Sequence, residues 1–315
     1  MSQTNLNTPP LFAGLDIAKA SLQLHLAGQS HGLDNQAKGH QKLIKLLRAQ
    51  PGAHVVCEPT GGYEQSVLHA LHAAKLPVSL VEAGRVRHFA KAKGLRAKTD
   101  PIDAAVLTEY GVAMRPAATP PRSEIQQQLL QLSNRRRQLL DLKVLEQNRA
   151  EHYADAFSQK QSRQLLKLLE KQITSCDQVL AQLVQADPAL QTKVQRLDAI
   201  PGVGPVTATL ILAQMPELGQ LTPQTAAALA GLAPYNQDSG DQAGVRRIYG
   251  GRKTVRCALY MAALSAVKHD RILKAFYQHL RKAGKKPIVA LTACMRKLIV
   301  LMNHLLKNPK FQLAN

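Results

Sequence analysis

The chain has 315 residues, 45% of them apolar, so it is long enough for two ordinary domains and too apolar to be globally disordered. Its four cysteines form no C-x-x-C pair, which argues against a zinc ribbon or a disulfide framework and suits a reducing cytoplasm. Lys and Arg number 41 against 21 Asp and Glu, and the resulting net charge of +20 favours nucleic acid as the partner. No apolar run approaches the roughly 18 residues that cross a bilayer, and the polar N-terminus is expected to be neither a signal peptide nor an anchor, so no membrane partner is expected.

The basic excess lies in two parts of the chain. Residues 239–315 hold 16 basic and two acidic side chains, and residues 84–98 hold six basic and no acidic ones, whereas the rest is nearly balanced. We expect both parts to bind phosphates, with a solvated helix face as the alternative for residues 84–98. The chain has seven Tyr, five Phe and no Trp, which argues against base-stacking platforms of the single-strand-binding type. The expected phosphate ligands of the shorter part are Arg85, Arg87, Lys91, Lys93, Arg96 and Lys98.

A first domain is expected over residues 11–115, after a disordered tail at 1–10 and before a linker marked by PAATPP. Strands come first and then alternate with helices, which is typical of an α/β sheet with a parallel portion. The expected elements are strands at 11–18, 21–27 and about 31–36, a helix at 38–49, a strand at 54–58, a helix at 63–74, a strand at 77–81, a basic segment that is helical in part, and a helix that begins at Asp100.

Residues 122–190 are expected to form a helical connector. They contain no Gly, and no Pro before Pro188, and apolar residues repeat at steps of three and four. This pattern predicts an antiparallel pair of long helices with a break near residues 154–160. A plain helical bundle and a coiled-coil dimer arm remain equal alternatives.

The remainder, residues 196–315, is expected to be an all-α domain of short helices that opens with a helix-hairpin-helix. In the turn I-P-G-V-G-P, Gly202 and Gly204 would let backbone N–H groups approach a phosphate, assisted by the N-terminus of the following helix. A tight turn without a ligand is the alternative. Between two of the later helices, residues 234–252 form an unusually long polar loop.

Four carboxylates stand at the ends of expected elements. Asp16 closes the first strand and Glu58 closes the strand at 54–58. Asp100 and Asp103 lie three residues apart at the start of a helix, so both side chains project from one face. Mg²⁺ takes oxygen ligands, and a pair of such ions can stabilise the attacking and leaving oxygens of a phosphate. Together with the basic charge, these acids predict a metal-dependent nuclease site.

Each acid taken alone also has a structural explanation. In T-D-P-I-D, Asp100 is a natural N-cap, and Asp103 would favour the helix dipole. Asp16 could end a strand in a turn, and Glu58 could face solvent. The nuclease site therefore depends on the four acids occurring together.

Six segments spread over nearly the whole chain carry recognisable motifs. They are GLDIAK at 14–19, CEPTGGY at 57–63, GLRAKTDPIDA at 94–104, IPGVGPVTA at 200–208, LAGLAPYNQDSG at 229–240 and RKTVRCALYMAA at 252–263. In this order, they resemble the DEDD transposases of the insertion sequence 110 family. One departure is Pro59, where the family often has Ala after the glutamate.

The resemblance implies more than the residues alone. It implies a RuvC-like (RNase H-like) N-terminal domain and a C-terminal transposase domain that supplies a serine nucleophile, matched here by Ser239. It also implies an RNA-guided recombinase, in which an element-encoded bridge RNA pairs with donor and target DNA. The implied metal ligands are Asp16, Glu58, Asp100 and Asp103, with Mg²⁺ as the metal.

A Ser-Gly pair in a loop is ordinarily just a turn, but the surroundings of Ser239 favour catalysis. The basic residues that follow it can hold a phosphodiester and stabilise charge on phosphorus. A serine hydroxyl needs activation by a base or a metal, and we expect the carboxylate site to supply it, in cis or in trans. The basic residues are Arg246, Arg247, Arg252, Lys253 and Arg256.

The sequence therefore predicts a cytoplasmic, nucleoid-associated bacterial transposase that forms a dimer or tetramer and breaks and rejoins DNA through a serine–phosphate intermediate. One alternative is a RuvC-like Holliday-junction resolvase that uses metal-activated water, which the long helical insert and the Ser239 loop disfavour. The other is a non-catalytic helix-hairpin-helix DNA-binding protein with structural acids, which the acid constellation disfavours.

Overall fold

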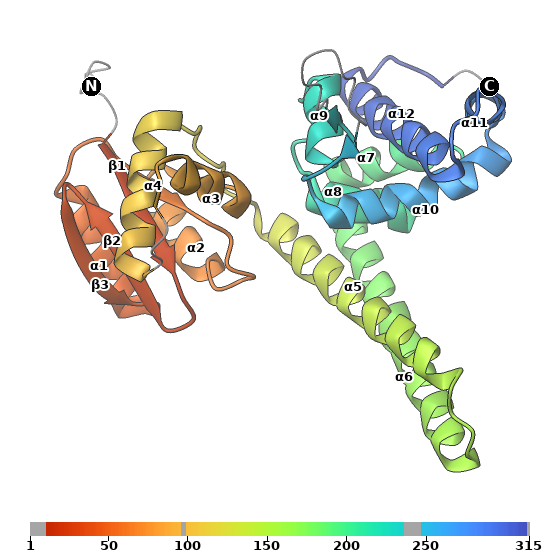
Figure 1. Cartoon of the computed structure of the whole chain (residues 1–315), viewed down its shortest axis with the longest axis horizontal. Coiled ribbons are helices and arrows are strands. Elements are labelled where there is room, and N and C mark those ends of the chain that lie inside the picture. The colour runs from red at the N-terminus through yellow and green to blue at the C-terminus, as the bar shows by residue number, and fades with distance from the viewer. Residues whose placement is uncertain (1–10, 96–98, 236–246, 314–315) are drawn as a thin grey trace. The chain divides into compact units, whose positions relative to one another are not determined.

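The chain forms two compact units, Met1–Pro121 and Arg122–Asn315, in a computed structural model that describes residues 11–95, 99–235 and 247–313 (Figure 1). The tail expected at 1–10 lies outside the described residues. The first unit continues past the expected end at Arg115 because the following residues bond to the sheet. Thr119 N–H donates to the carbonyl of Val78 at 2.8 Å, and Leu80 N–H donates to the Thr119 hydroxyl at 3.0 Å.

The first unit is built on a five-stranded mixed sheet with the order β3-β2-β1-β4-β5. Strand β1 is antiparallel to β2 and parallel to β4, and β4 is parallel to β5. The expected α/β sheet with a parallel portion is confirmed. The strands are β1 (Leu11–Ile17), β2 (Ser21–Leu26), β3 (Gln29–Asp34), β4 (Ala53–Cys57) and β5 (Val78–Leu80).

Helices cover both faces of this sheet. Successive side chains of β1 point to opposite faces, so the strand contributes to two apolar cores. Leu15 and its odd-numbered neighbours pack in the core that contains α1 and α2, and Phe12 packs in the core that contains α3 and α4. Figure 1 shows α4 lying along β1. The helices are α1 (Ala37–Arg48), α2 (Gln65–Ala73), α3 (Ala83–Ala92) and α4 (Asp100–Met114).

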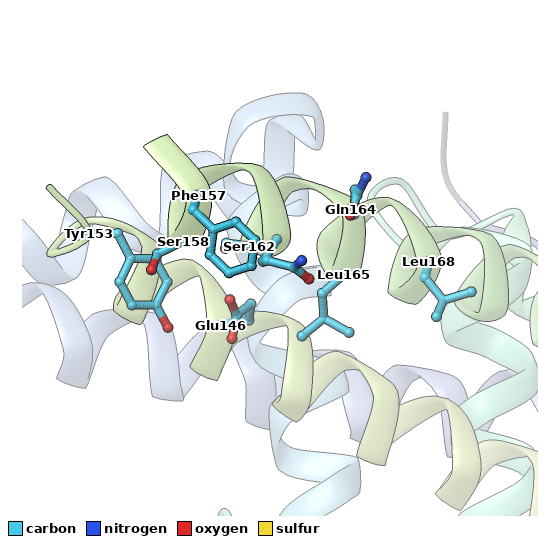
Figure 2. A pocket seen from close by; sticks show the side chains of 9 residues that line it. Glu146, Tyr153, Phe157, Ser158, Ser162, Gln164, Leu165 and Leu168 are labelled. Carbon is cyan, nitrogen blue, oxygen red and sulfur yellow. The ribbon is translucent and has the colours of Figure 1, made fainter. Parts of the chain in front are cut away.

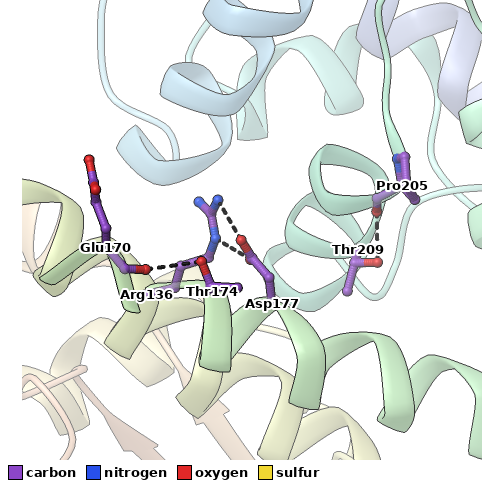
Figure 3. A network of polar contacts seen from close by, with 6 residues as sticks. All are labelled: Arg136, Glu170, Thr174, Asp177, Pro205 and Thr209. Carbon is purple, nitrogen blue, oxygen red and sulfur yellow. Dashed lines mark hydrogen bonds and ion pairs between the residues drawn. The ribbon is translucent and has the colours of Figure 1, made fainter. Parts of the chain in front are cut away.

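The second unit begins with a helical hairpin of α5 (Glu124–Ala150) and α6 (Ala156–Ala186), and the break falls at residues 151–155. Ser123 and Gln126 form a capping box at the start of α5. The two helices are joined by an ion pair in which Arg136 donates from Nη2 to Asp177 Oδ2 at 3.2 Å (Figure 3). The paired long helices thus exist as expected.

The rest of the second unit packs around one apolar core. The expectation of an all-α domain is wrong in one detail, because two short strands at residues 234–235 and 247–248 pair with each other here. Helix α12 holds 21 residues. Among the described residues it is also the one helix long and apolar enough to span a membrane by composition, and half of its most apolar window is buried inside the unit. The elements are α7 (Pro188–Asp198), α8 (Pro205–Gln214), α9 (Pro223–Leu229), β6 (Pro234–Tyr235), β7 (Arg247–Ile248), α10 (Lys253–His269), α11 (Arg271–Lys282) and α12 (Pro287–Lys307).

Candidate active site

The close packing of α4 on β1 determines what lies beside Asp16. A Cβ on Gly14 would come within 1.9 Å of the Ala104 carbonyl oxygen, and a Cβ on Gly111 would come within 2.8 Å of the Phe12 side chain. Later residues of the strand therefore meet earlier residues of the helix. Two strand residues rise about 6.6 Å and four helix residues about 6 Å. Asp16 is the next residue on this face after Gly14, so it lies beside the first turn of α4.

Glu58 reaches the same end of the sheet from the neighbouring strand. The parallel register pairs Gly14 with Val56, and Val56 packs in the same core as Phe12. Continued by two residues, this register brings Glu58 level with Asp16, on strands about 4.8 Å apart. The backbone thus gathers Asp16, Glu58 and the first turn of α4 at the carboxyl ends of β1 and β4.

The negative charge of Glu58 affects the pKa of the neighbouring thiol, Cys57. Burial raises the pKa of Cys57 to about 12, and the negative charges of Glu64 and Glu58 contribute to the rise. Asp16, Glu58 and Asp103 are partly buried, whereas Asp100 is exposed. Three of the four carboxylates are thus partly shielded from water at this end of the sheet.

The donor set fits magnesium in its chemistry, because all four side chains offer carboxylate oxygens. Within the described ranges, no three His, Cys, Asp or Glu side chains stand close enough together to hold one metal ion. The side chains of the tetrad are therefore gathered by the backbone but do not form a closed ligand cage.

The start of α4 differs from the expectation that Asp100 caps this helix. Thr99, not Asp100, occupies the N-cap position, and Asp103 N–H donates to the Thr99 carbonyl at 2.8 Å. The explanation of Asp100 as an N-cap is wrong, because the helix begins with this residue.

Thr108 holds α4 against the sheet. Its Oγ1 accepts a hydrogen bond from Gly14 N–H at 2.8 Å and lies 2.9 Å from Nδ1 of His25 on β2. The same oxygen lies 3.2 Å from the carbonyls of His25 and Ala104. One side chain thus joins β1, β2 and α4 about two helical turns after Asp100, the first acid of the helix.

Glu64 shapes the turn that follows Glu58. Its Oε2 accepts hydrogen bonds from the N–H and the hydroxyl of Thr60, each at 3.0 Å, and from Gly62 N–H at 2.9 Å. Burial alone would raise its pKa, but backbone N–H groups, including those of Thr60 and Gly62, hold the pKa of Glu64 below its ordinary value. Glu64 is therefore a structural carboxylate that fixes the turn.

Asn35 joins this turn to the rest of the same sheet end. Its Nδ2 donates to the carbonyls of Ala18 at 2.9 Å and Tyr63 at 3.1 Å, and its Oδ1 lies 2.8 Å from Nε2 of His40. The segments after β1 and after β4 are thus held by one amide.

The basic residues expected at 84–98 divide into three groups. Arg85, Arg87 and Lys91 are exposed on α3, and Arg85 lies 3.8 Å from Glu82, which is also exposed. Lys93 is ion-paired with Glu109 of α4 and lies 5.8 Å from the ring of Phe89. Arg96 and Lys98 lie outside the described residues.

The turn between α7 and α8 has two glycines in different situations. Gly202 has a φ of +89°, and a Cβ there would come within 2.5 Å of Ala266 N on α10. Packing against α10 therefore accounts for Gly202 without a ligand. Gly204 is exposed at the N-cap of α8, and a Cβ there would meet open space.

Two short paired strands, β6 and β7, stand at the two ends of the segment that carries Ser239, and we call this pair the β6–β7 base. Strands β6 and β7 pair antiparallel, with Tyr235 opposite Arg247. Below them, a Cβ on Gly251 would come within 2.2 Å of Gly231 N, and Arg256 donates from Nη1 to the Gly250 carbonyl at 2.8 Å. Ser239 and Arg246 themselves lie outside the described residues.

The expected phosphate ligands near this base are not equivalent. Arg252 donates from Nη1 to the Gln214 carbonyl at 2.7 Å and lies 2.6 Å from a carboxylate oxygen of Glu217. Arg247 and Lys253 are exposed. Arg252, like Arg256, is thus engaged within the protein.

Two family models match the chain. One, described as "Transposase IS116/IS110/IS902 family", matches residues 194–278, and the other, described as "Transposase" of the DEDD IS110 type, matches residues 13–159. The chain belongs to the IS110 family of transposases. This confirms the family that the sequence motifs resemble, and the enzyme is one of DNA recombination.

Two relatives match this chain over almost its full length. The chain is 27% identical over 303 residues to the pilin gene-inverting proteins of Moraxella bovis and of Moraxella lacunata, and each match covers 92% of this chain and 94% of the relative. Among solved structures, T. thermophilus RuvC in complex with Holliday junction substrate matches at 16% identity, covering 35% of this chain and 99% of that chain, with a TM-score of 0.27.

The matched segments contain the candidate sites of the transposase. The segment 13–159 contains the four acids together with Thr108, Glu64 and Asn35, and the segment 194–278 contains the α7–α8 turn and the β6–β7 base. The three positioning residues were not predicted from the sequence. The two glutamates around T-G-G were a visible signal for Glu64, whereas nothing local marks Thr108.

Proposed function

We propose that the N-terminal unit of this transposase is a RuvC-like nuclease centre in which Asp16, Glu58, Asp100 and Asp103 bind Mg²⁺. The observation that carries the proposal is the meeting of the carboxyl ends of β1 and β4 with the first turn of α4. Bound Mg²⁺ would supply electrostatic stabilisation of phosphate oxygens. Thr108 and Glu64 act as positioning residues for these carboxylates.

Ser239 is the proposed nucleophile of strand cleavage. Its oxygen forms a bond to phosphorus, the P–O bond to the departing DNA end breaks, and the serine proton passes to a base while the departing oxygen gains one. Attack by a DNA hydroxyl on the serine ester reverses these changes, so no external energy is needed. A nucleophile must be held in position by the backbone around it. The pairing of β6 with β7 and the close approach of Gly231 and Gly251 support this role, because they fix the backbone at both ends of the segment.

Exposed basic residues would hold donor and target DNA by their phosphates. We assign this role to Arg247, Lys253, Arg87 and Lys91, because these four side chains are exposed. The exposed N-terminus of α8 at Gly204 is a further phosphate contact in the proposed helix-hairpin-helix.

We also propose that a bridge RNA guides the transposase and that the transposase acts in the cytoplasm at the nucleoid. We further propose that it forms a dimer or tetramer. The tip of the α5–α6 hairpin supports oligomerisation because apolar side chains gather there on the surface (Figure 2). Phe157 is 72% exposed and Leu168 is 53% exposed, beside a hollow of about 470 Å³. Such a surface favours burial against a second copy.

A recombination assay on DNA that carries the ends of the element tests this function. Wild-type protein should yield recombinant product that chelator abolishes, and Asp16→Asn and Ser239→Ala should yield none while still binding DNA. Water-dependent strand cutting by Ser239→Ala would contradict the proposal and favour a resolvase. Sequencing of RNA that co-purifies with the protein tests the guide.

A further inference from the structure

A large groove crosses the C-terminal unit away from the β6–β7 base. It lies between the α7–α8 turn, the start of α11, the length of α12 and the tail at 308–313, and its volume is about 1280 Å³. Small-molecule pockets range from roughly 300 to 1000 Å³, so this groove is large enough for a segment of a macromolecule.

The charge of the groove is almost entirely positive. Arg271, Arg296, Lys297 and Lys307 line it, and all four are exposed. Among the described residues, no carboxylate lies within 4.0 Å of the charged groups of these four side chains. The one carboxylate in the lining, Asp270, accepts a hydrogen bond from Leu273 N–H at 2.7 Å as the cap of α11. The groove therefore fits an anionic chain.

Aromatic rings stand beside these cations. Phe276 and Phe311, two of the five phenylalanines of the chain, line the groove together with His304. Phe311 is 37% exposed, and its ring centroid lies 4.6 Å from that of His304. Nζ of Lys297 lies 4.2 Å from the centroid of Phe276. A ring and a cation at adjacent points suit a base and its phosphate.

The wall that carries Phe311 is held firmly. Arg196 of α7 donates to the carbonyls of Pro309 at 2.7 Å, Leu305 at 2.8 Å and Asn308 at 3.0 Å. One guanidinium thus fixes the end of α12 and the tail, so the ring of Phe311 is presented from a defined backbone.

We propose that this groove binds an unpaired stretch of nucleic acid, with bases against Phe311 and Phe276 and phosphates on Arg296 and Lys297. The small number of aromatic residues in the sequence argued against such a platform, but the fold brings two of them into one basic groove. The inference rests on the proposed action on nucleic acid only for the identity of the anionic chain. An acidic amphipathic peptide has the same charge and is distinguished by the test.

Fluorescence anisotropy with the full chain tests the groove. The probes are labelled oligothymidylate, labelled oligouridylate and a labelled DNA duplex. Phe311→Ala should weaken binding of the single strands about tenfold, as loss of one stacked base does, and leave duplex binding unchanged. Tyr260→Ala, which removes a ring of α10 that is 37% exposed like Phe311 but lies outside the lining of the groove, is the matched control and should change nothing. A loss confined to one single-stranded probe supports the groove and assigns it to DNA or to RNA.

Lys297→Gln provides a second variant in case Phe311→Ala does not fold. It should lower the salt slope of single-strand binding by about 0.7, whereas the exposed Lys160→Gln should leave the slope unchanged. Unchanged single-strand binding in both groove variants, or an equal loss with the duplex, would overturn the proposal. So would a glutamate-rich amphipathic peptide that depends on Phe311 while single strands do not. Ser239→Ala leaves this binding intact, so the groove and the proposed catalysis can fail separately.

Discussion

The hydroxyl of Thr108 contacts three elements that together position the acids of the N-terminal unit. It accepts from Gly14 N–H on β1, meets His25 on β2 and belongs to α4. The acids themselves leave the ends of these elements. We therefore expect Thr108, which carries no charge, to help position Asp16 beside the first turn of α4.

Replacing this hydroxyl with a methyl group tests its role. Thr108→Val keeps the side-chain shape but leaves Gly14 N–H without its acceptor, so the N-terminal unit should lose about 1–3 kcal/mol of unfolding free energy. Urea denaturation followed by a probe in the unit that carries the substitution measures each loss. Thr192→Val removes an exposed hydroxyl that bonds only within α7, and it should cost less than about 0.5 kcal/mol. Equal losses in both variants would contradict the role of Thr108.

The lowered pKa of Glu64 predicts how the stability of the protein depends on pH. Hydrogen bonds hold its pKa below the unfolded value of about 4.3, despite burial that leaves it only 5% exposed. Its contribution to stability is fully present above the unfolded pKa and is lost as the pH falls through the lower folded pKa.

Glu64→Gln should therefore be less stable than the wild type near neutral pH, and the difference should shrink as the pH falls below about 4. Urea midpoints measured across this range test it. The exposed Glu151→Gln serves as the control. A difference that does not change with pH would show that the carboxylate charge is not what stabilises the turn.

At the scale of elements, the sequence pattern predicts much of the fold but not its contacts. Short apolar runs predicted β1 and β4, and helical spacing predicted α5 and α6, because both patterns are local. The contact of Gly14 with Ala104 joins residues about 90 positions apart and depends on a missing side chain, which no local pattern reveals. The groove around Phe311 escaped prediction for the same reason, since composition does not say which rings meet.

The candidate site was predictable in part for a related reason. The types and spacing of Asp100 and Asp103 indicated a metal-binding chemistry, but two arginines of the C-terminal unit could not be distinguished from true phosphate ligands. Arg252 and Arg256 differ from Lys253 only through partners that folding supplies.

This difference gives a prediction at the scale of the β6–β7 base. Lys253→Gln should lower the slope of log affinity against log salt for duplex DNA by about 0.9, because one phosphate contact is lost. Arg252→Gln should change that slope little, since its guanidinium already pairs with Glu217, but should lower stability. Equal slope changes in the two variants would show that Arg252 leaves Glu217 to bind DNA.

At the scale of the whole molecule, we propose that acids of one unit and a serine of the other act in a single reaction. The two units fold around separate cores, so a substitution in one can leave the other folded. This separation allows each half of the proposed chemistry to be removed alone.

Mass spectrometry of the protein–DNA adduct tests this claim most directly. Reactions quenched midway should yield a peptide in which Ser239 carries a nucleotide through a phosphoester bond. Asp16→Asn should lose this adduct although its serine is intact, and Ser239→Ala should lose it although its carboxylates are intact, while both variants remain folded and bind DNA. Strand cleavage by Ser239→Ala at the wild-type rate, with no adduct in any variant, would contradict the account.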